Sequence, residues 1–185
     1  MLFCLNNGLL TVDPGLTESI CLKVNFDGLP LYKSSSVSLC PILCSIDDIS
    51  RPFPLGLFCG IGKPELNVFL KNLCEEIKEL LHFGYVHNGC RFVVSKVLFL
   101  CDSPARAFVQ CILGHTAKNG CGYCTIQGEW FANRVVFPYG PTCPSRTNLK
   151  YSTGTENNQI SLSPLLRLVD FYGGVPPDYM HAVYQ

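Results

Sequence analysis

The chain has 185 residues, a length typical of one domain with an insertion. Basic and acidic residues number 14 each; residues 1–100 carry 8 basic against 9 acidic and residues 101–185 carry 6 against 5, so neither half is a basic tail that binds nucleic acid through phosphates alone. Hydrophobic residues make up 48% of the chain and charged residues 15%, which excludes a largely disordered protein.

The 12 cysteines do not by themselves indicate a secreted disulfide scaffold. The segment that begins at Met1 has neither the basic start nor the small-residue cleavage site of a signal peptide. Most cysteines stand singly in apolar runs, where a reduced cysteine acts as a small core hydrophobe. No run reaches the roughly 18 apolar residues of a membrane span. We therefore expect a soluble, non-secreted protein in a reducing compartment.

After an N-terminal extension, residues 1–19, the chain predicts a three-strand meander. Residues 20–26 alternate apolar and polar side chains and end at an Asp-Gly turn signal, which places Asp27 at the end of the strand. Two further apolar runs, 37–46 and 53–60, are bounded by turn-forming residues. The short connections favour antiparallel pairing.

A change of period then predicts a helix and a return strand. Over residues 65–83 the apolar side chains fall on one helical face. Residues 91–101 are predicted to be a buried strand beside 20–26, with Asp102 just beyond it. Ser103, which precedes a proline, is the expected N-cap of a short helix over residues 105–113.

The second half of the chain is less regular. Residues 114–136 are rich in glycine and cysteine, residues 138–163 are polar and predict a surface loop, and 165–169 resume helical spacing. We therefore expect a mixed α/β core over 20–113, followed by a Cys/His insertion and loop over 114–185.

Asp27 and Asp102 are the first candidate site. If their strands are neighbours, both carboxylates emerge at one edge of the sheet, where they could share divalent cations as hard oxygen ligands for phosphodiester chemistry. The alternative is that each is only a turn-forming residue, and spacing alone favours this alternative.

Cys121 and Cys124 are the second candidate site, because a Cys-x2-Cys turn supplies two thiolates to one zinc ion. His181 is the preferred third ligand, and His115 or Asp178 is the candidate for the fourth. A redox pair and two chance cysteines are the alternatives.

An ordered series of short motifs resembles transposases of animal DNA transposons, similar to the CACTA (En/Spm) group. The motifs cover residues 20–185, nearly the whole chain, and they occur in one order. They are Val24-Asn-Phe-Asp27-Gly-Leu-Pro, Lys33-Ser-Ser-Ser, Phe58-Cys-Gly60-x2-Lys63-Pro, Cys101-Asp102-Ser-Pro-Ala-Arg106-Ala, Gly114-His115, Gly120-Cys121-x2-Cys124, Gly128-Glu129, Asn133-Arg134-x2-Phe137-Pro and Asp178-Tyr-Met-His181.

The resemblance implies an RNase H-like catalytic core that binds two Mg²⁺ (or Mn²⁺) ions and cleaves and joins DNA at transposon ends, in the nucleus. Asp27 and Asp102 match the first two acidic residues of the family. The Cys-x2-Cys and Asp-x2-His elements match those of an insertion with a structural Zn²⁺ before the third acidic residue.

The family's third acidic residue, a Glu on a later helix, has no counterpart, because the chain ends four residues after His181. We therefore expect a truncated or degenerate core that is inactive alone. A non-enzymatic remnant that acts as a binding module is the main alternative, and a thiol-redox protein that uses Cys121 and Cys124 ranks last. Whether the chain is an enzyme, and whether it forms homo-oligomers, stays open.

Overall fold

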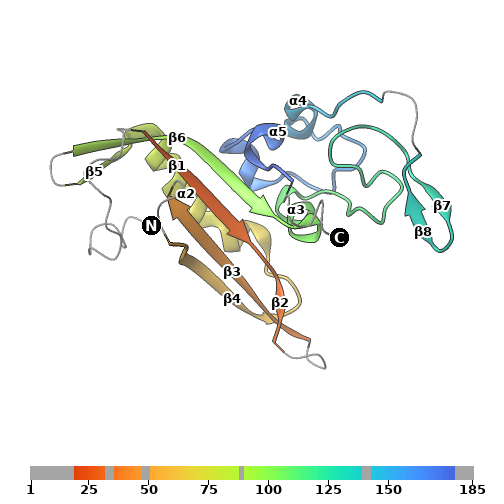
Figure 1. Ribbon diagram of the computed structural model, residues 1–185, viewed down its shortest axis with the longest axis horizontal. Helices are drawn as coiled ribbons and strands as arrows, with labels where there is room; N and C mark the ends of the chain where they lie inside the picture. The colour runs from red at the N-terminus through yellow and green to blue at the C-terminus, as the bar shows by residue number, and fades with distance from the viewer. Residues whose placement is uncertain (1–18, 32–35, 47–50, 88–89, 139–142, 178–185) are drawn as a thin grey trace. The chain divides into compact units, whose positions relative to one another are not determined.

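The computed structural model describes residues 19–31, 36–46, 51–87, 90–138 and 143–177. The chain divides into two compact units, Met1–Leu100 and Cys101–Gln185. The first unit is built around a mixed sheet with one long helix, and the second consists of short elements joined by ordered loops (Figure 1). The expectation of a mixed α/β fold is confirmed.

Over its described residues, the first unit contains the long helix α2 and a sheet of six strands. The sheet has the order β2-β3-β1-β6-β5, and β4 pairs with β3 off this path. The elements are β1 (Ser19–Phe26), β2 (Leu29–Pro30), β3 (Val37–Ile46), β4 (Phe53–Ile61), α2 (Leu66–Phe83), β5 (Tyr85–His87) and β6 (Cys90–Cys101).

The predicted antiparallel meander is confirmed. β1 pairs with β3 from Leu22↔Ile46 to Phe26↔Ile42, and β3 pairs with β4 along most of its length. On β1 the side chains at alternate positions are buried, which is the alternation that predicted the strand. The two-residue strand β2, also paired with β3, was not predicted.

β6 lies beside β1 and runs parallel to it. The amide of Asn25 donates to the carbonyl of Leu100 at 2.9 Å, and the hydroxyl of Ser95 donates to the carbonyl of Ile20 at 3.3 Å. Both bonds join residues that are 75 positions apart, so the two strands advance in the same direction. Parallel neighbours need a crossover connection, and α2 lies within it.

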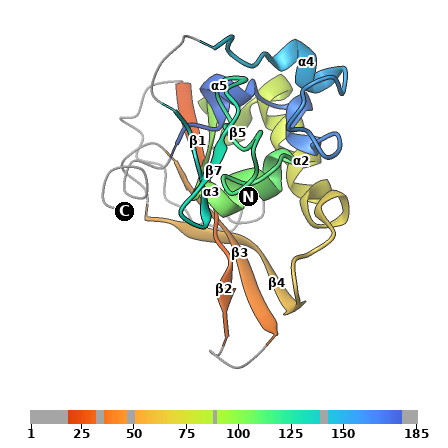
Figure 2. The ribbon, with the colours of Figure 1, turned by 90° about the vertical axis from the view of Figure 1, so that its right-hand side faces the viewer.

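The helix α2 packs its apolar face in the core of this unit. Glu65 caps its N-terminus by accepting from the amides of Asn67 and Val68, and Gly84 ends it with φ of 70°. The ring of Phe69 on α2 lies 6.2 Å from that of Phe58 on β4, in agreement with the helix lying along one face of the sheet (Figures 1 and 2). The buried side chains include Ile20, Leu22, Val24 and Phe26 of β1, Ile42, Cys44 and Ile46 of β3, Leu66, Leu70, Leu73, Ile77 and Leu80 of α2, Tyr85 of β5, and Phe92, Val94, Val97 and Phe99 of β6.

The second unit begins with a helix whose start corrects the sequence prediction. The helix covers Ser103–Gln110 rather than 105–113, and Asp102, not Ser103, is its N-cap. The Asp102 carboxylate accepts from the amide of Ala105 at 2.7 Å. The helix ends at Cys111, which adopts a left-handed conformation with φ of 55°. The elements are α3 (Ser103–Gln110), β7 (Glu129–Phe131), β8 (Arg134–Val136), α4 (Asn148–Ser152), the 3₁₀ helix η1 (Pro164–Arg167) and α5 (Phe171–Gly174).

The prediction of a surface loop over 138–163 is only partly right for residues 143–163, where most residues are exposed but several are buried. Arg146, Tyr151, Glu156 and Asn158 are buried there, and α4 forms within the segment. The composition is polar, but the polar groups bond to one another inside the unit instead of to water. Among the described residues no helix is both long and apolar enough to span a membrane.

Candidate functional site

Asp27 follows β1 directly and is exposed. Its Oδ1 atom accepts from the amide of Gly28 at 2.7 Å, a local turn bond that fixes the orientation of the carboxylate. This bond occupies one oxygen of the carboxylate, and a cation ligand needs only the other.

Asp102 follows β6 directly and is half-buried. As the N-cap of α3 it holds its Oδ1 atom on the amide of Ala105, and the positive end of the helix dipole favours its negative charge. The Asp102 carboxylate therefore has a structural role as a helix cap, which agrees with the alternative that this residue only shapes the local backbone.

The strand register relates the two aspartates. Asn25 of β1 is hydrogen-bonded to Leu100 of β6, and each aspartate comes two residues after its member of that pair. The adjacency of β1 and β6 confirms the prediction for strands 20–26 and 91–101, and Asp27 and Asp102 are the residues that follow these strands in the sequence.

The Cys-x2-Cys pair lies entirely within the second unit. The Sγ atoms of Cys121 and Cys124 are 3.5 Å apart, and the amide of Cys124 points at the Cys121 sulfur at 3.4 Å. Two sulfurs bound to one tetrahedral zinc ion at about 2.3 Å would lie roughly 3.8 Å apart, so the turn presents its thiols at nearly the required spacing.

The two thiols differ in acidity. Burial by itself raises the pKa of Cys121, but hydrogen bonds from the amides of Cys124 and Tyr123, the Cys124 thiol and the charge of Arg146 together bring this pKa below the usual 9.0. Burial raises the pKa of Cys124, and the neighbouring Cys121 raises it further. Cys121 is therefore the thiol that becomes a thiolate first.

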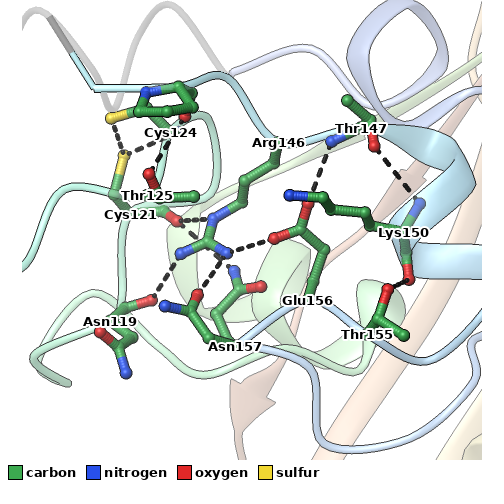
Figure 3. Close-up of polar contacts among 12 residues, drawn as sticks. Asn119, Cys121, Cys124, Thr125, Arg146, Thr147, Lys150, Thr155, Glu156 and Asn157 are labelled. Carbon is green, nitrogen blue, oxygen red and sulfur yellow. Dashed lines mark hydrogen bonds and ion pairs between the residues drawn. The ribbon is translucent and has the colours of Figure 1, made fainter.

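Arg146, which the sequence analysis missed, anchors the cysteine turn (Figure 3). Its Nε atom donates to the carbonyl of Cys121 at 2.8 Å and its Nη2 to the carbonyl of Asn119 at 3.3 Å. Its Nη1 donates to Glu156 at 2.8 Å and to Asn157 at 2.7 Å. The side chains of Arg146 and Glu156 are 0% and 2% exposed, so this is a buried ion pair. The signal available in the sequence is that Glu156 is the only acidic residue among 138–163.

The segment that contains Arg146 also pairs with the turn through its backbone. Cys124 forms a bridge with Ser145, and the amide of Arg146 donates to the carbonyl of Tyr123 at 2.9 Å. The hydroxyl of Tyr172 also donates to this carbonyl, and Arg106 of α3 lies over the Tyr123 ring at 4.7 Å. Segments far apart in the sequence thus hold the Cys-x2-Cys turn in one conformation.

Of the remaining zinc candidates, His115 is described and does not join the cysteine pair. His115 is exposed, and its Nδ1 atom lies 3.5 Å from the hydroxyl of Ser103 at the start of α3. Within the described part of the chain no three His, Cys, Asp or Glu side chains form a group that could hold a metal ion. Asp178 and His181 lie outside the described residues. The structure therefore brings together two thiols and does not add His115 to them.

Comparisons with known proteins identify no relative: no protein-family model, no curated protein sequence and no solved structure matches the chain.

Proposed function

We propose that the chain carries part of the catalytic core of a DNA transposase with an RNase H-like fold, similar to the CACTA (En/Spm) group. The observation that carries the proposal is the parallel pairing of β1 and β6, from whose ends Asp27 and Asp102 follow. An antiparallel meander, a crossover helix and a parallel strand beside the first form an arrangement that serves such chemistry, because it delivers two carboxylates from neighbouring strand ends.

Asp27 and Asp102 are the residues that would hold Mg²⁺ or Mn²⁺. Carboxylate oxygens are the ligands that these hard cations prefer. When bound, the ions would activate the attacking oxygen and stabilise the leaving oxygen of a phosphodiester. The contribution of the protein is positional, since the bonds from Gly28 and Ala105 restrain both carboxylates before any ion arrives. The proposed substrate is the DNA of transposon ends, and the proposed location is the nucleus.

Cys121 and Cys124 fit a structural zinc ion as two of its four ligands. Thiolates are soft donors that suit zinc, and the Sγ–Sγ distance of 3.5 Å matches one edge of a tetrahedral site. Residues of the Asp178 to His181 element would complete the set. Such an ion would hold the Cys-x2-Cys turn in place, in addition to the hydrogen bond from Arg146 to the carbonyl of Cys121.

A non-enzymatic binding module is the competing function, and one observation favours it. Both aspartates already have structural partners, Gly28 for Asp27 and Ala105 for Asp102, and turn and cap chemistry alone accounts for these bonds. In that case the sheet and the cysteine turn are retained but neither carboxylate binds a cation.

Iron-directed backbone cleavage distinguishes the two functions. Fe²⁺ replaces Mg²⁺ at carboxylate sites, and with ascorbate and peroxide it cleaves the peptide backbone near the bound ion. We expect fragments from cleavage near residue 27 and near residue 102 in the same preparation, and excess Mg²⁺ should suppress both. Asp102→Asn should abolish cleavage at both places, because asparagine preserves the helix cap but removes the charge.

Asp170 supplies the matched control. It caps α5 through the amides of Tyr172 and Gly173, as Asp102 caps α3, but it follows no strand of the sheet. Asp170→Asn should leave the cleavage pattern unchanged. Cleavage at only one of the two aspartates, or a pattern that survives Asp102→Asn, would favour the binding module.

A further inference from the structure

Arg106 is a charged side chain of α3 that supplies no ligand to either candidate metal site. It lies one helical turn after Asp102, and its amide donates to the Asp102 carbonyl at 2.8 Å. Residues four apart on a helix lie on the same side, so the Arg106 side chain leaves α3 from the turn that Asp102 caps. The half-buried Arg106 side chain can therefore fasten this end of the helix to its surroundings.

The guanidinium of Arg106 contacts Tyr123 in two ways. Its Nη1 atom donates to the Tyr123 hydroxyl, and its Cζ atom lies 4.7 Å from the centroid of the ring. A cation within about 6 Å of an aromatic face is attracted by the negative charge of that face. A Cβ atom at Gly122 would lie 3.3 Å from the Nη2 atom of Arg106, so the glycine beside Tyr123 leaves room for the guanidinium.

Tyr123 is itself held from other directions. It stands directly before Cys124 in the cysteine turn, and its carbonyl accepts from the amide of Arg146 at 2.9 Å and from the hydroxyl of Tyr172. The rings of Tyr123 and Tyr172 meet edge to face with their centroids 6.2 Å apart. Arg106 thus connects α3 to a fixed part of the second unit.

The two ends of α3 are held differently. Near the C-terminus Val109 is fully buried, and its carbonyl accepts from the buried hydroxyl of Ser163 at 2.5 Å. At the N-terminus the hydroxyl of Ser103 lies 3.5 Å from the Nδ1 atom of His115, in an exposed contact. The charged bond of Arg106 is the stronger support at this end, because hydrogen bonds from a guanidinium are stronger than those between neutral groups.

We propose that Arg106 is a positioning residue for Asp102: by binding Tyr123 it fixes the first turn of α3, and with it the direction in which the Asp102 carboxylate is presented. The inference rests on the proposed function, because a metal ligand must be held within about 0.5 Å of its working geometry. It extends that function by giving the cysteine turn a part in orienting the carboxylate.

Hydrogen exchange of the Ala105 amide, measured by NMR on the metal-free chain, reports the bond to Asp102 directly. Arg106→Met and Tyr123→Leu should each speed this exchange about fivefold, the factor that corresponds to the loss of one capping bond. The double variant should exchange no faster than either single variant, because both residues act through one contact. Arg106→Lys keeps a donor and a positive charge and should restore part of the protection.

The amide of Lys150 is the internal control, because the hydroxyl of Thr147 caps α4 through it at 3.3 Å in the same unit. Arg167→Met, at an exposed arginine, should leave both amides unchanged. Unchanged exchange of Ala105 in Arg106→Met would overturn the inference. Equal acceleration at Ala105 and Lys150 would also overturn it, since it would show only a general loosening of the second unit.

A titration with Mn²⁺ connects the contact to the proposed function. Arg106→Met should weaken the tightest Mn²⁺ site about twofold, because the Asp102 carboxylate spends less time in the binding geometry, and Arg106→Lys should recover part of the affinity. Faster exchange with unchanged Mn²⁺ affinity would overturn the positioning role. A wild-type chain that binds no Mn²⁺ would refute the proposed function, whereas the metal-free exchange would still test the contact of Arg106.

Discussion

At the scale of single residues, Arg146 organises the second unit because four of its five N–H donors bond inside the protein. It joins the carbonyls of Asn119 and Cys121 to the side chains of Glu156 and Asn157. A guanidinium presents its donors in a rigid fork, which lysine cannot reproduce. A buried charge left without its partner is far more costly than the pair itself is stabilising.

We predict that Arg146→Met lowers the free energy of unfolding by about 3–5 kcal/mol, because it leaves the Glu156 carboxylate buried and unpaired. Urea denaturation followed by circular dichroism measures the loss. Arg167 is exposed, and Arg167→Met is expected to change stability by less than about 0.5 kcal/mol. If the double variant Arg146→Met/Glu156→Gln is no more stable than Arg146→Met alone, the account of the buried pair is wrong.

The acidity of Cys121 gives a second prediction. Because the thiolate is the nucleophile and the pKa of Cys121 is lowered, its alkylation by iodoacetamide should already be fast below pH 9 and should gain little as pH rises further. Burial raises the pKa of Cys44 to about 12, so Cys44 should stay unmodified in the folded chain at the same pH. Peptide mapping after short exposure measures the order, and modification of Cys124 before Cys121 would contradict it.

The zinc content of the purified protein tests whether Cys121 and Cys124 are metal ligands. Protein prepared with zinc present should contain close to one ion per chain by elemental analysis, and Cys121→Ser should remove it, because one thiolate cannot retain a structural ion. Cys59→Ser is the matched control, since Cys59 is an exposed cysteine of β4 in the other unit. Metal-free wild-type protein would show that the turn serves another purpose.

At the scale of elements, the hydrophobic periodicity of the sequence is sufficient to predict the strands and the helix that form the regular core. The alternation of Leu22, Val24 and Phe26 predicted β1, and the spacing of Leu66 through Leu80 predicted α2, because each pattern directly reports a buried face. Short connections then favoured the meander. Asp27 and Asp102 followed as site candidates from their positions at strand ends.

The rest could not be predicted because it depends on pairing between distant residues. Arg146 and Glu156 lie in a segment without periodicity, and only the folded chain shows that their charges are buried together. The cap of α3 was assigned to Ser103 because serine before proline is a common cap, whereas Asp102 takes the role one residue earlier. Two- and three-residue strands such as β2 and β7 are too short to produce a sequence period.

The cap of α3 leads to a prediction at this scale. Asp102→Ala should destabilise the chain by about 1 kcal/mol, because it leaves the amide of Ala105 without its acceptor. Asp102→Asn should cost less than half as much, since asparagine is also a good cap. Thermal unfolding of the two variants measures the difference, and equal losses would show that the charge of Asp102, rather than its cap, stabilises the helix.

At the scale of the whole molecule, the near-zero net charge means that any action on DNA must come from local features. Two such features stand out in the part of the chain that the structure describes: the aspartates that follow β1 and β6, and the cysteine turn anchored by Arg146. These features are independent of one another in their chemistry. They use hard carboxylates and soft thiolates, so each can be removed without removing the other.

The most direct measurement of the central claim is a double-mutant cycle for Mn²⁺ binding, followed by the electron paramagnetic resonance signal of the free ion. If Asp27 and Asp102 share a metal site, Asp27→Asn and Asp102→Asn should each abolish the tightest binding, and the double variant should bind no more weakly than either single variant. Losses that add independently, or a tight site that survives both substitutions, would contradict the shared site and with it the proposed transposase core.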